Sequence, residues 1–194
     1  NGTPSGFEAV NRGKIHCGSL VTVEAGNILL DTSAVMDTAQ ISSWTGGGDL
    51  MVTKSLLYVE PIWDEYTPDF SGLTNFDGHS VYVSGGATLT LAGVTRYEAV
   101  AGPSYSSLQA SGADSVLSLP DLTDLAGLEN RTIFVQAFNG ARVELPALTT
   151  CETGPVFFDA NGGDSWIEMP LLGSFTGSPV GSSGFRARNG GEIN

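Results

Sequence analysis

A triplet of aliphatic residues with a fixed internal spacing recurs along this chain. In Val143, Leu145 and Leu148, the second and third members follow the first at offsets of two and five. Three further triplets have the same spacing: Leu89, Leu91, Val94; Leu117, Leu119, Leu122; and Ile167, Met169, Leu172. The first members of successive copies stand at positions 89, 117, 143, 167 and 193. The chain therefore consists of units of about 25 residues, and any fold must accommodate that repeat.

A bend rich in glycine and asparagine precedes most of these triplets. Asn139-Gly140 is one example, and it lies between the alternating apolar pairs Val135, Ala137 and Val143, Leu145. Glycine and asparagine adopt positive φ at low cost, so each bend predicts a left-handed corner. Alternation with a period of two is typical of strands that bury one face. Each unit is therefore predicted to contain strands joined by a tight corner.

A unit of this size cannot bury its apolar face alone and must stack on its neighbours. We therefore predict an all-β fold, a single-stranded parallel β-helix (a solenoid) with coils of about 24–28 residues and strands ~4.8 Å apart. The chirality preference of parallel crossovers favours a right-handed helix. A β-sandwich and a leucine-rich repeat are the alternatives, but neither explains the fixed offset between bend and triplet.

The whole chain, residues 1–194, is predicted to be one solenoid domain, regular over 81–194 and irregular over 1–80. Ile15, Cys17 and Leu20 form an early copy of the triplet. The intervals from 15 to 50 and from 50 to 89 exceed one coil, so loops are expected there. The clearest protruding loop is expected at about residues 59–78.

The charge of the chain argues against several classes of partner. With 21 acidic and 8 basic residues, the formal net charge is −13. Such a surface repels nucleic acid and anionic lipid, so neither is an expected partner. The sequence has no apolar run near the ~20 residues of a membrane helix, so membrane insertion is not expected.

Two segments resemble a known group of proteins. Residues 187–193 read Ala-Arg-Asn-Gly-Gly-Glu-Ile, and residues 119–127 read Leu-Pro-Asp-Leu-Thr-Asp-Leu-Ala-Gly. They resemble coils of secreted bacterial β-helix surface proteins of the planctomycete type, and the second is also similar to receptor L-domain repeats. The resemblance implies a structural, non-enzymatic role and a secreted or cell-surface location. It carries over no catalytic residue, so none is assigned.

The cysteines and histidines indicate core packing rather than a metal site. Cys17 occupies an inward position, and Cys151 lies several coils away, too far for a disulfide. His16 and Cys17 are adjacent in a predicted strand and should point to opposite faces. His79 stands alone, far from the other histidine and from both cysteines. No metal ligand is therefore assigned.

Glu144 and Glu168 occupy the same outward position on consecutive coils. Their spacing is compatible with the carboxylate pair of a retaining glycosidase. A solvated like-charge pair relieved by Arg142 is the favoured interpretation. Asn1 and Asn130 begin N-glycosylation triplets, which is a weak signal.

The predicted loop contains a mixture of carboxylates and aromatic rings: Trp63, Asp64, Glu65, Tyr66 and Asp69. Carboxylates can bind calcium, and aromatic faces can stack on sugars. The spacing matches no calcium-loop motif, so a packed loop is favoured over a calcium or glycan site.

The two ends of the chain carry the same motif, because residues 7–15 align without gaps on residues 185–193. Two aligned pairs are oppositely charged, Glu8 with Arg186 and Lys14 with Glu192. The leading hypothesis is a solenoid of an extracellular fibre, surface layer or adhesin that stacks head-to-tail. Its predicted interface consists of Glu8, Asn11, Lys14, Ile15, Phe185, Arg186, Asn189, Glu192 and Ile193. The alternatives are a segment of a longer β-helical adhesin and a carbohydrate-binding or carbohydrate-cleaving β-helix.

Overall fold

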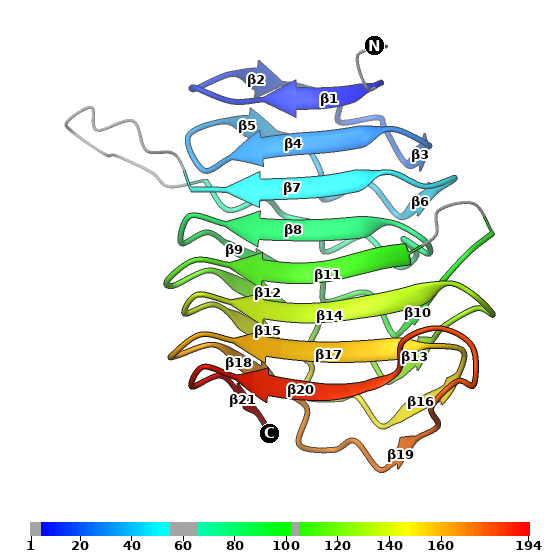
Figure 1. Cartoon of the computed structure of the whole chain (residues 1–194). Helices are drawn as coiled ribbons and strands as arrows, with labels where there is room; N and C mark the ends of the chain where they lie inside the picture. The colour runs from blue at the N-terminus through cyan, green and yellow to red at the C-terminus, as the bar shows by residue number, and fades with distance from the viewer. Residues whose placement is uncertain (1–4, 55–65, 102–104) are drawn as a thin grey trace.

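The computed structural model describes residues 5–54, 66–101 and 105–194, which form 21 strands stacked in one column (Figure 1). Eight strands form a single parallel sheet, wall A, and each of them is one rung of the column. In chain order they are β1 (Gly6–Ala9), β4 (Asn27–Asp31), β7 (Asp49–Thr53), β8 (Ser80–Ser84), β11 (Tyr105–Ser111), β14 (Thr132–Phe138), β17 (Val156–Asn161) and β20 (Gly184–Arg188). No described residue lies in a helix, so the described chain has no helix that could span a membrane.

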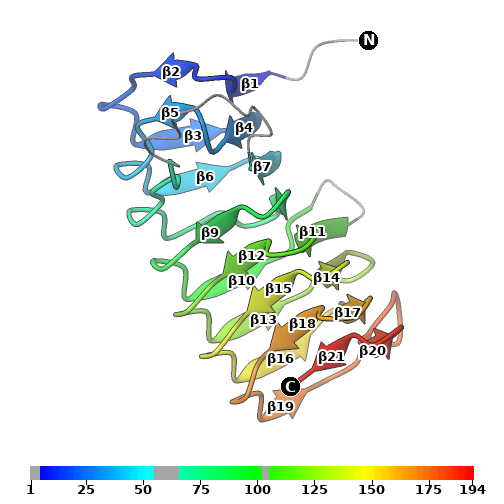
Figure 2. The ribbon, with the colours of Figure 1, turned by 90° about the vertical axis from the view of Figure 1, so that its left-hand side faces the viewer.

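Two further walls complete each coil (Figure 2). Wall B contains β9 (Thr88–Thr90), β12 (Val116–Ser118), β15 (Arg142–Glu144), β18 (Trp166–Glu168) and β21 (Glu192–Ile193). Wall C contains β10 (Arg96–Glu98), β13 (Asp124–Ala126), β16 (Thr150–Thr153) and β19 (Ser174–Phe175). In the first coils two separate sheets replace them: β2 (Lys14–Ile15) with β5 (Val35–Met36), and β3 (Thr22–Glu24) with β6 (Ser43–Thr45).

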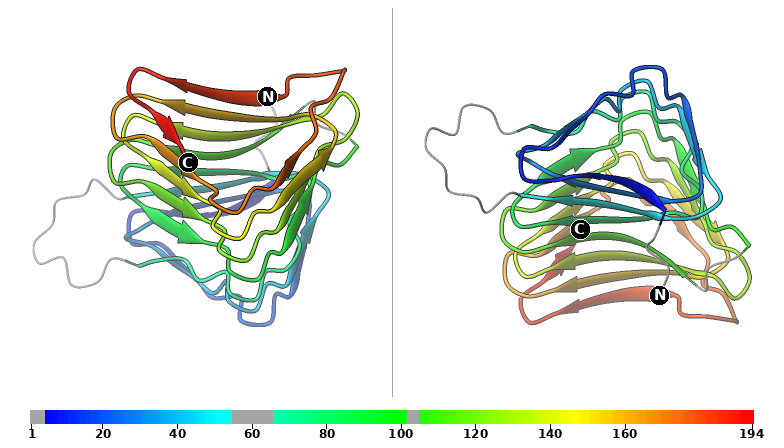
Figure 3. Two further views of the ribbon diagram at one scale, coloured as in Figure 1. Left: turned by 90° about the horizontal axis from the view of Figure 1, so that it is seen from below. Right: turned by 90° about the horizontal axis from the view of Figure 1, so that it is seen from above.

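The winding is right-handed, as predicted. Seen from below, with the C-terminal coil nearest the viewer, the chain runs counterclockwise as it approaches (Figure 3, left). All pairings between the named strands are parallel. The predicted fold class, an all-β single-stranded parallel β-helix, is therefore confirmed.

The second members of the aliphatic triplets form one vertical file at the end of wall B. The amides of Leu91, Leu119 and Leu145 each donate to a carbonyl of the next coil at 2.9, 2.9 and 2.8 Å. All three side chains are fully buried, and Met169 continues the file at 6% exposure. The recurrent spacing in the sequence thus marks inward positions that stack from coil to coil.

Wall A contains a second inward file. The strand register places one small or branched residue of each rung directly above the next: Ala9, Leu30, Val52, Val83, Ala110, Ala137, Ala160 and Ala187. The corner that follows is left-handed, as the asparagine and glycine residues predicted. Asn139 and Gly140 have φ values of 57° and 84°, and Asn189 and Gly190 have 52° and 83°.

Residues 5–54 differ from the prediction, because their coils are shorter than expected. Hydrogen bonds between stacked residues show the coil length: Ser42 and Val21 are 21 residues apart, and Asp49 and Asn27 are 22 apart. In the later coils Ser107 and Ser80 are 27 residues apart. The interval from residue 15 to residue 50, which exceeds one coil of the predicted length, therefore holds parts of two short coils. Only the coil between the paired residues Val52 and Val83 is longer than the later ones.

The loop expected at about residues 59–78 was also placed wrongly at its C-terminal side. Residues 59–65 lie outside the described part of the chain, but Phe70, Leu73 and Phe76 are buried in the core. The amide of Leu73 donates to the carbonyl of Phe70 at 2.9 Å, and Leu148 donates to Leu145 in the same way. Residues 70–73 are thus an ordinary corner of a coil, with phenylalanine where later coils have leucine.

Candidate assembly surfaces

The first and last coils have the same backbone geometry. The gap-free alignment of the two ends carries the start of β1, Gly6, onto the start of β20, Gly184, and it carries all of β2 onto β21. Each corner is closed by a backbone hydrogen bond, 2.9 Å from Gly13 to Val10 and 3.0 Å from Gly191 to Arg188. The corner residues Asn11 and Asn189 both have φ of 52°. The sequence match between the ends is therefore also a structural match.

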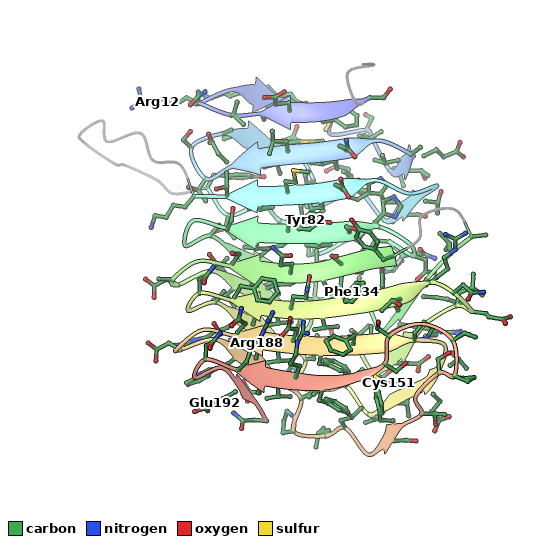
Figure 4. The ribbon with its side chains drawn as sticks, in the orientation of Figure 1. Arg12, Tyr82, Phe134, Cys151, Arg188 and Glu192 are labelled. Atoms are coloured by element: carbon green, nitrogen blue, oxygen red, sulfur yellow. The ribbon has the colours of Figure 1, made fainter. Side chains whose placement is uncertain are left out.

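Both ends expose a sheet edge. In wall A, β1 and β20 are the outermost strands, so no described strand pairs with the outer edge of either. Arg12 beside the first coil and Glu192 beside the last lie at opposite ends of the column (Figure 4). Unpaired N–H and C=O groups of such edges can pair with a strand of another chain.

The C-terminal end also exposes apolar surface. The ring of Phe185 stacks on Phe158 with a centroid distance of 5.1 Å and an interplanar angle of 5°, yet Phe185 is 47% exposed. At the other end Phe7 is half-buried and packs against the core. The ends also differ at the next inward position, because Ala9 is buried whereas its counterpart Ala187 is exposed.

A buried carboxylate accepts hydrogen bonds from both arginines of the last rung. Arg186 donates to the two oxygens of Asp159 at 3.1 and 2.6 Å, and Arg188 donates to Oδ2 at 3.2 Å. Asp159 is only 1% exposed, and its hydrogen bond raises the pKa of Arg186. Sequence reasoning found Arg186 but missed Asp159 and Arg188. Asp159 lies 27 residues before Arg186, one coil step, and this spacing was the available signal.

The first corner is held by a carboxylate of the following coil. Asp31 Oδ2 accepts the amide of Asn11 at 2.8 Å, and Asp31 Oδ1 accepts the hydroxyl of Ser33 at 2.6 Å. Burial alone would raise the pKa of Asp31, but these hydrogen bonds outweigh it and lower the pKa. In the last coil Asn189 instead bonds Asn161 through the side-chain amides at 2.7 Å.

The remaining predicted interface residues lie on wall B and its early counterpart. Ile15 pairs with Met36 and Ile193 pairs with Ile167, and both are half-buried at the open ends. The two exposed charged positions beside them, Lys14 and Glu192, pair with residues of the adjacent strand of their own chain. The structure therefore divides the nine predicted residues into two groups, one at each end of the column.

The candidate ligand loop does not come together as a site within the described residues. Trp63, Asp64 and Glu65 lie outside that part of the chain. The Tyr66 hydroxyl donates to the carbonyl of Met36. Asp69 accepts from Ser71, including its amide at 2.8 Å, and these hydrogen bonds lower the pKa of Asp69. Both described members thus stabilise local backbone, and the described residues contain no cluster of three potential metal ligands.

Glu144 and Glu168 are neighbours on wall B, as predicted. Arg142, however, stacks over the indole of Trp166 with its guanidinium carbon 4.6 Å from the ring centroid. That stacking was not foreseen, because Arg142 and Trp166 become neighbours only through the coil register.

The two thiols are free and lie in different coils. His16 is exposed and Cys17 is half-buried against the core, in agreement with opposite orientations along the strand. His16 Nδ1 lies 3.5 Å from a carboxylate oxygen of Asp37.

A strip of aromatic rings on the outer face of wall A was also missed. The centroid of Phe134 lies 5.9 Å from Tyr105 and 6.2 Å from Phe157, both edge-on. The guanidinium of Arg186 covers Phe157 at 5.1 Å, and Figure 4 shows Tyr82 and Phe134 on this face. The strip couples consecutive rungs from outside, as the aliphatic files do from inside.

The described strands define the class of protein as a right-handed parallel β-solenoid. No protein-family model matches the chain, and neither the curated proteins nor the solved structures contain a significant match.

Proposed function

We propose that this protein is a non-enzymatic structural subunit that stacks end to end, with β20 and β21 of one copy placed against β1 and β2 of a second copy. The observation that carries the proposal is the single gap-free alignment that relates both strands of the two terminal coils. Because the corners of the two terminal coils have matching geometry, a second copy can continue the column with the spacing used inside it.

The proposed contact extends both inward files. In wall A, Ala160 and Ala187 would be followed by Ala9 of the second copy. In wall B, Ile167 and Ile193 would be followed by Ile15 of the second copy. The contact would bury Phe185 and pair the two open edges, so backbone hydrogen bonds and apolar burial supply its driving force.

Charge selects the register of the contact. Glu8 of the second copy would lie beside Arg186, and Lys14 beside Glu192. Such cross-strand pairs contribute roughly 0.2–1 kcal/mol each, so they direct the contact more than they drive it. On wall A the charges of the stacked side chains then alternate between negative and positive, in the order Asp159, Arg186, Glu8.

Wall C limits the contact. Its last described strand, β19, belongs to the coil before β20 and β21, so wall C is one rung shorter. A stacked second copy therefore meets walls A and B, and one rung of wall C stays open beside Phe175.

A head-to-tail contact that does not close produces a filament. We place the filament outside the cell, in a fibre, surface layer or adhesin, on the basis of the resemblance to secreted surface proteins. The net charge of −13 supports this role by keeping the sides of separate filaments apart.

The test combines sedimentation velocity and negative-stain electron microscopy of the purified chain over a series of concentrations. We expect end-to-end oligomers that grow with concentration, and a charge reversal, Lys14→Glu or Glu192→Lys, should weaken them. The double variant should restore association, whereas Glu144→Lys, on the same wall but away from the ends, should leave it unchanged. A monomer at every concentration would refute the proposal.

A further inference from the structure

A sealed aromatic cluster joins the first coils to the rest of the column. Trp44 on β6 and His79, immediately before β8, have ring centroids 4.6 Å apart. Both side chains are at most 1% exposed. The ring centroids of Phe76 and of Tyr97, which lies on β10 of wall C, are 4.7 Å apart, and the Tyr97 hydroxyl donates to the carbonyl of His79 at 2.6 Å.

The sheet pairing changes at this junction. The β2–β5 and β3–β6 sheets do not continue into walls B and C, so wall A is the only sheet that runs through the described column. Outside wall A, an isolated bridge between Ser43 and Asn75 links β6 to the next coil. The amide of Trp44 also donates to the carbonyl of Asn75 at 2.9 Å, and the amide of Thr74 donates to that of Ser42 at 3.0 Å. The cluster around His79 fills the core beside these hydrogen bonds.

The contacts of His79 determine which nitrogen carries its proton. Nδ1 lies 3.1 Å from the carbonyl of Phe76 and 3.0 Å from the carbonyl of Asp77. Both partners are acceptors, so Nδ1 must be the N–H of the neutral ring. Nε2 is then a bare acceptor, and it is buried without a partner among the described residues.

The neighbouring polar group is a donor. Trp44 Nε1 carries a hydrogen and is likewise buried without a described partner. In the neutral state the two rings bury one donor and one acceptor, neither of which is hydrogen-bonded within the described residues. Protonation can occur only at Nε2, and it would turn this pair into two buried donors and add a charge to a sealed core.

Burial lowers the pKa of His79 and outweighs every group that favours the protonated ring. Those groups are the carbonyls of Asp77 and Phe76, which accept from the ring, and the carboxylates of Asp49 on β7 and of Asp77. Burial also raises the pKa of Asp49, and the charge of His79 acts in the opposite direction.

We propose that His79 is a pH-sensitive latch between the first three rungs of wall A and the remainder of the solenoid. The neutral ring closes the junction, and protonation loosens it. In the unfolded chain histidine binds a proton near pH ~6.5, whereas the folded chain resists protonation. The unfolding equilibrium constant of the junction therefore rises by up to about tenfold per pH unit, from about pH 6.5 down to the folded pKa.

The chain has only two histidines, so the test can be made on the intact protein. A nuclear magnetic resonance titration of the two imidazoles follows each ring separately, with exposed His16 as the internal comparison. We expect the His79 resonance to keep its neutral, Nδ1-protonated form well below about pH 6.5. Titration of His79 at or above that value would overturn the proposal, and this experiment requires no variant.

A second experiment shows which strands lose protection when the pH falls. Hydrogen exchange near pH 7.5 and near pH 5.5, corrected for intrinsic rates, should show a loss of protection in β4 and β7 with little change in β14 and β17. His79→Gln should remove this difference, because glutamine does not titrate, and His16→Gln should retain it. An equal loss in wild type and His79→Gln would contradict the latch.

Discussion

The N-terminal region, residues 5–54, and the C-terminal region, residues 80–194, share one column but build their coils differently. Stacked residues are 21 or 22 residues apart in the first region, as in Ser42 with Val21 and Asp49 with Asn27. They are 23 to 28 apart in the second, from Ala160 with Ala137 at 23 to Leu117 with Leu89 at 28. Wall A nevertheless runs through both with strands of similar length. Coil length therefore changes in the corners and in the two other walls, while wall A keeps the register.

The corners that follow wall A show this most clearly. In the C-terminal region they are left-handed and use asparagine or glycine, as at Asn139 and Gly140. In the second coil a carboxylate replaces this device: Asp31 accepts the amide of Ser33 at 2.9 Å, and its carbonyl accepts the amide of Ala34 at 3.0 Å. At this corner a side chain can thus form the hydrogen bonds with backbone groups that a left-handed corner would otherwise turn toward the inside of the coil.

The core fillings differ in the same way. The inward file of wall A contains alanine in four consecutive C-terminal rungs, at 110, 137, 160 and 187. The short coils instead hold large side chains, among them Met36, Ile41 and Trp44, all at most 1% exposed. The size of the inward side chains thus matches the length of the coil in each region, and the core is buried in both.

The largest expected effect tests whether the two cores are equally sealed. Leu30→Ala in the N-terminal region and Leu145→Ala in the C-terminal region each remove a fully buried side chain. Each should lower the free energy of unfolding by roughly 2–5 kcal/mol, measured by urea denaturation. A loss well below that range for Leu30→Ala alone would show that the N-terminal core is loosely packed and would break the comparison.

Two glycine substitutions test the corners. A Cβ at Gly48 would lie 2.0 Å from the carbonyl oxygen of Gly26, whereas a Cβ at Gly163 would meet nothing within 4 Å. Gly48→Ala should therefore cost roughly 1–3 kcal/mol by overpacking. Gly163→Ala should be neutral or stabilise by ~0.4–1 kcal/mol through the unfolded chain. Thermal unfolding of the two variants measures this contrast, and equal effects would contradict it.

The carboxylate corner should respond to acid. Asp31→Ala removes several hydrogen bonds and should cost roughly 1–2 kcal/mol near neutral pH. The pKa of Asp31 is lowered in the folded chain, so its contribution is present above the ordinary value of 3.8 and is lost as pH falls through the folded pKa. Urea denaturation near pH 7 and near pH 3 should show wild type and variant converging. A constant difference would contradict the role given to Asp31.

The smallest effect concerns the outer surface of wall B. Glu144 and Glu168 are directly opposed like charges, which destabilise a sheet. Glu144→Gln should therefore stabilise the C-terminal region by roughly 0.2–1 kcal/mol, more at low salt than at high salt. Thermal unfolding at two salt concentrations measures it, and no gain at low salt would show that solvent already screens the pair.

The sequence predicted the C-terminal region well, because a fixed offset between bend and triplet has a single structural meaning in a stacked fold. It predicted the N-terminal region poorly, because Asp31 and Ser33 replace the corner residues. Phe70 was assigned to a loop, because it stands at a corner position that holds leucine in later coils. Pairs that depend on the vertical register, such as Arg186 with Asp159, could not be read before the coil lengths were known. The contact of Trp44 with His79 also depends on the long coil between Val52 and Val83. No spacing in the sequence predicts the length of that coil.

Intermolecular disulfide formation tests the stacking of the two ends most directly. Lys14 and Glu192 lie at opposite ends of the column, about 30 Å apart at one strand spacing per rung, beyond the reach of a disulfide. The variant Lys14→Cys, Glu192→Cys, with serine at 17 and 151, should form a ladder of covalent oligomers on mild oxidation. The control Lys14→Cys, Glu168→Cys should not. Absence of the ladder, or an equal ladder in the control, would contradict end-to-end stacking.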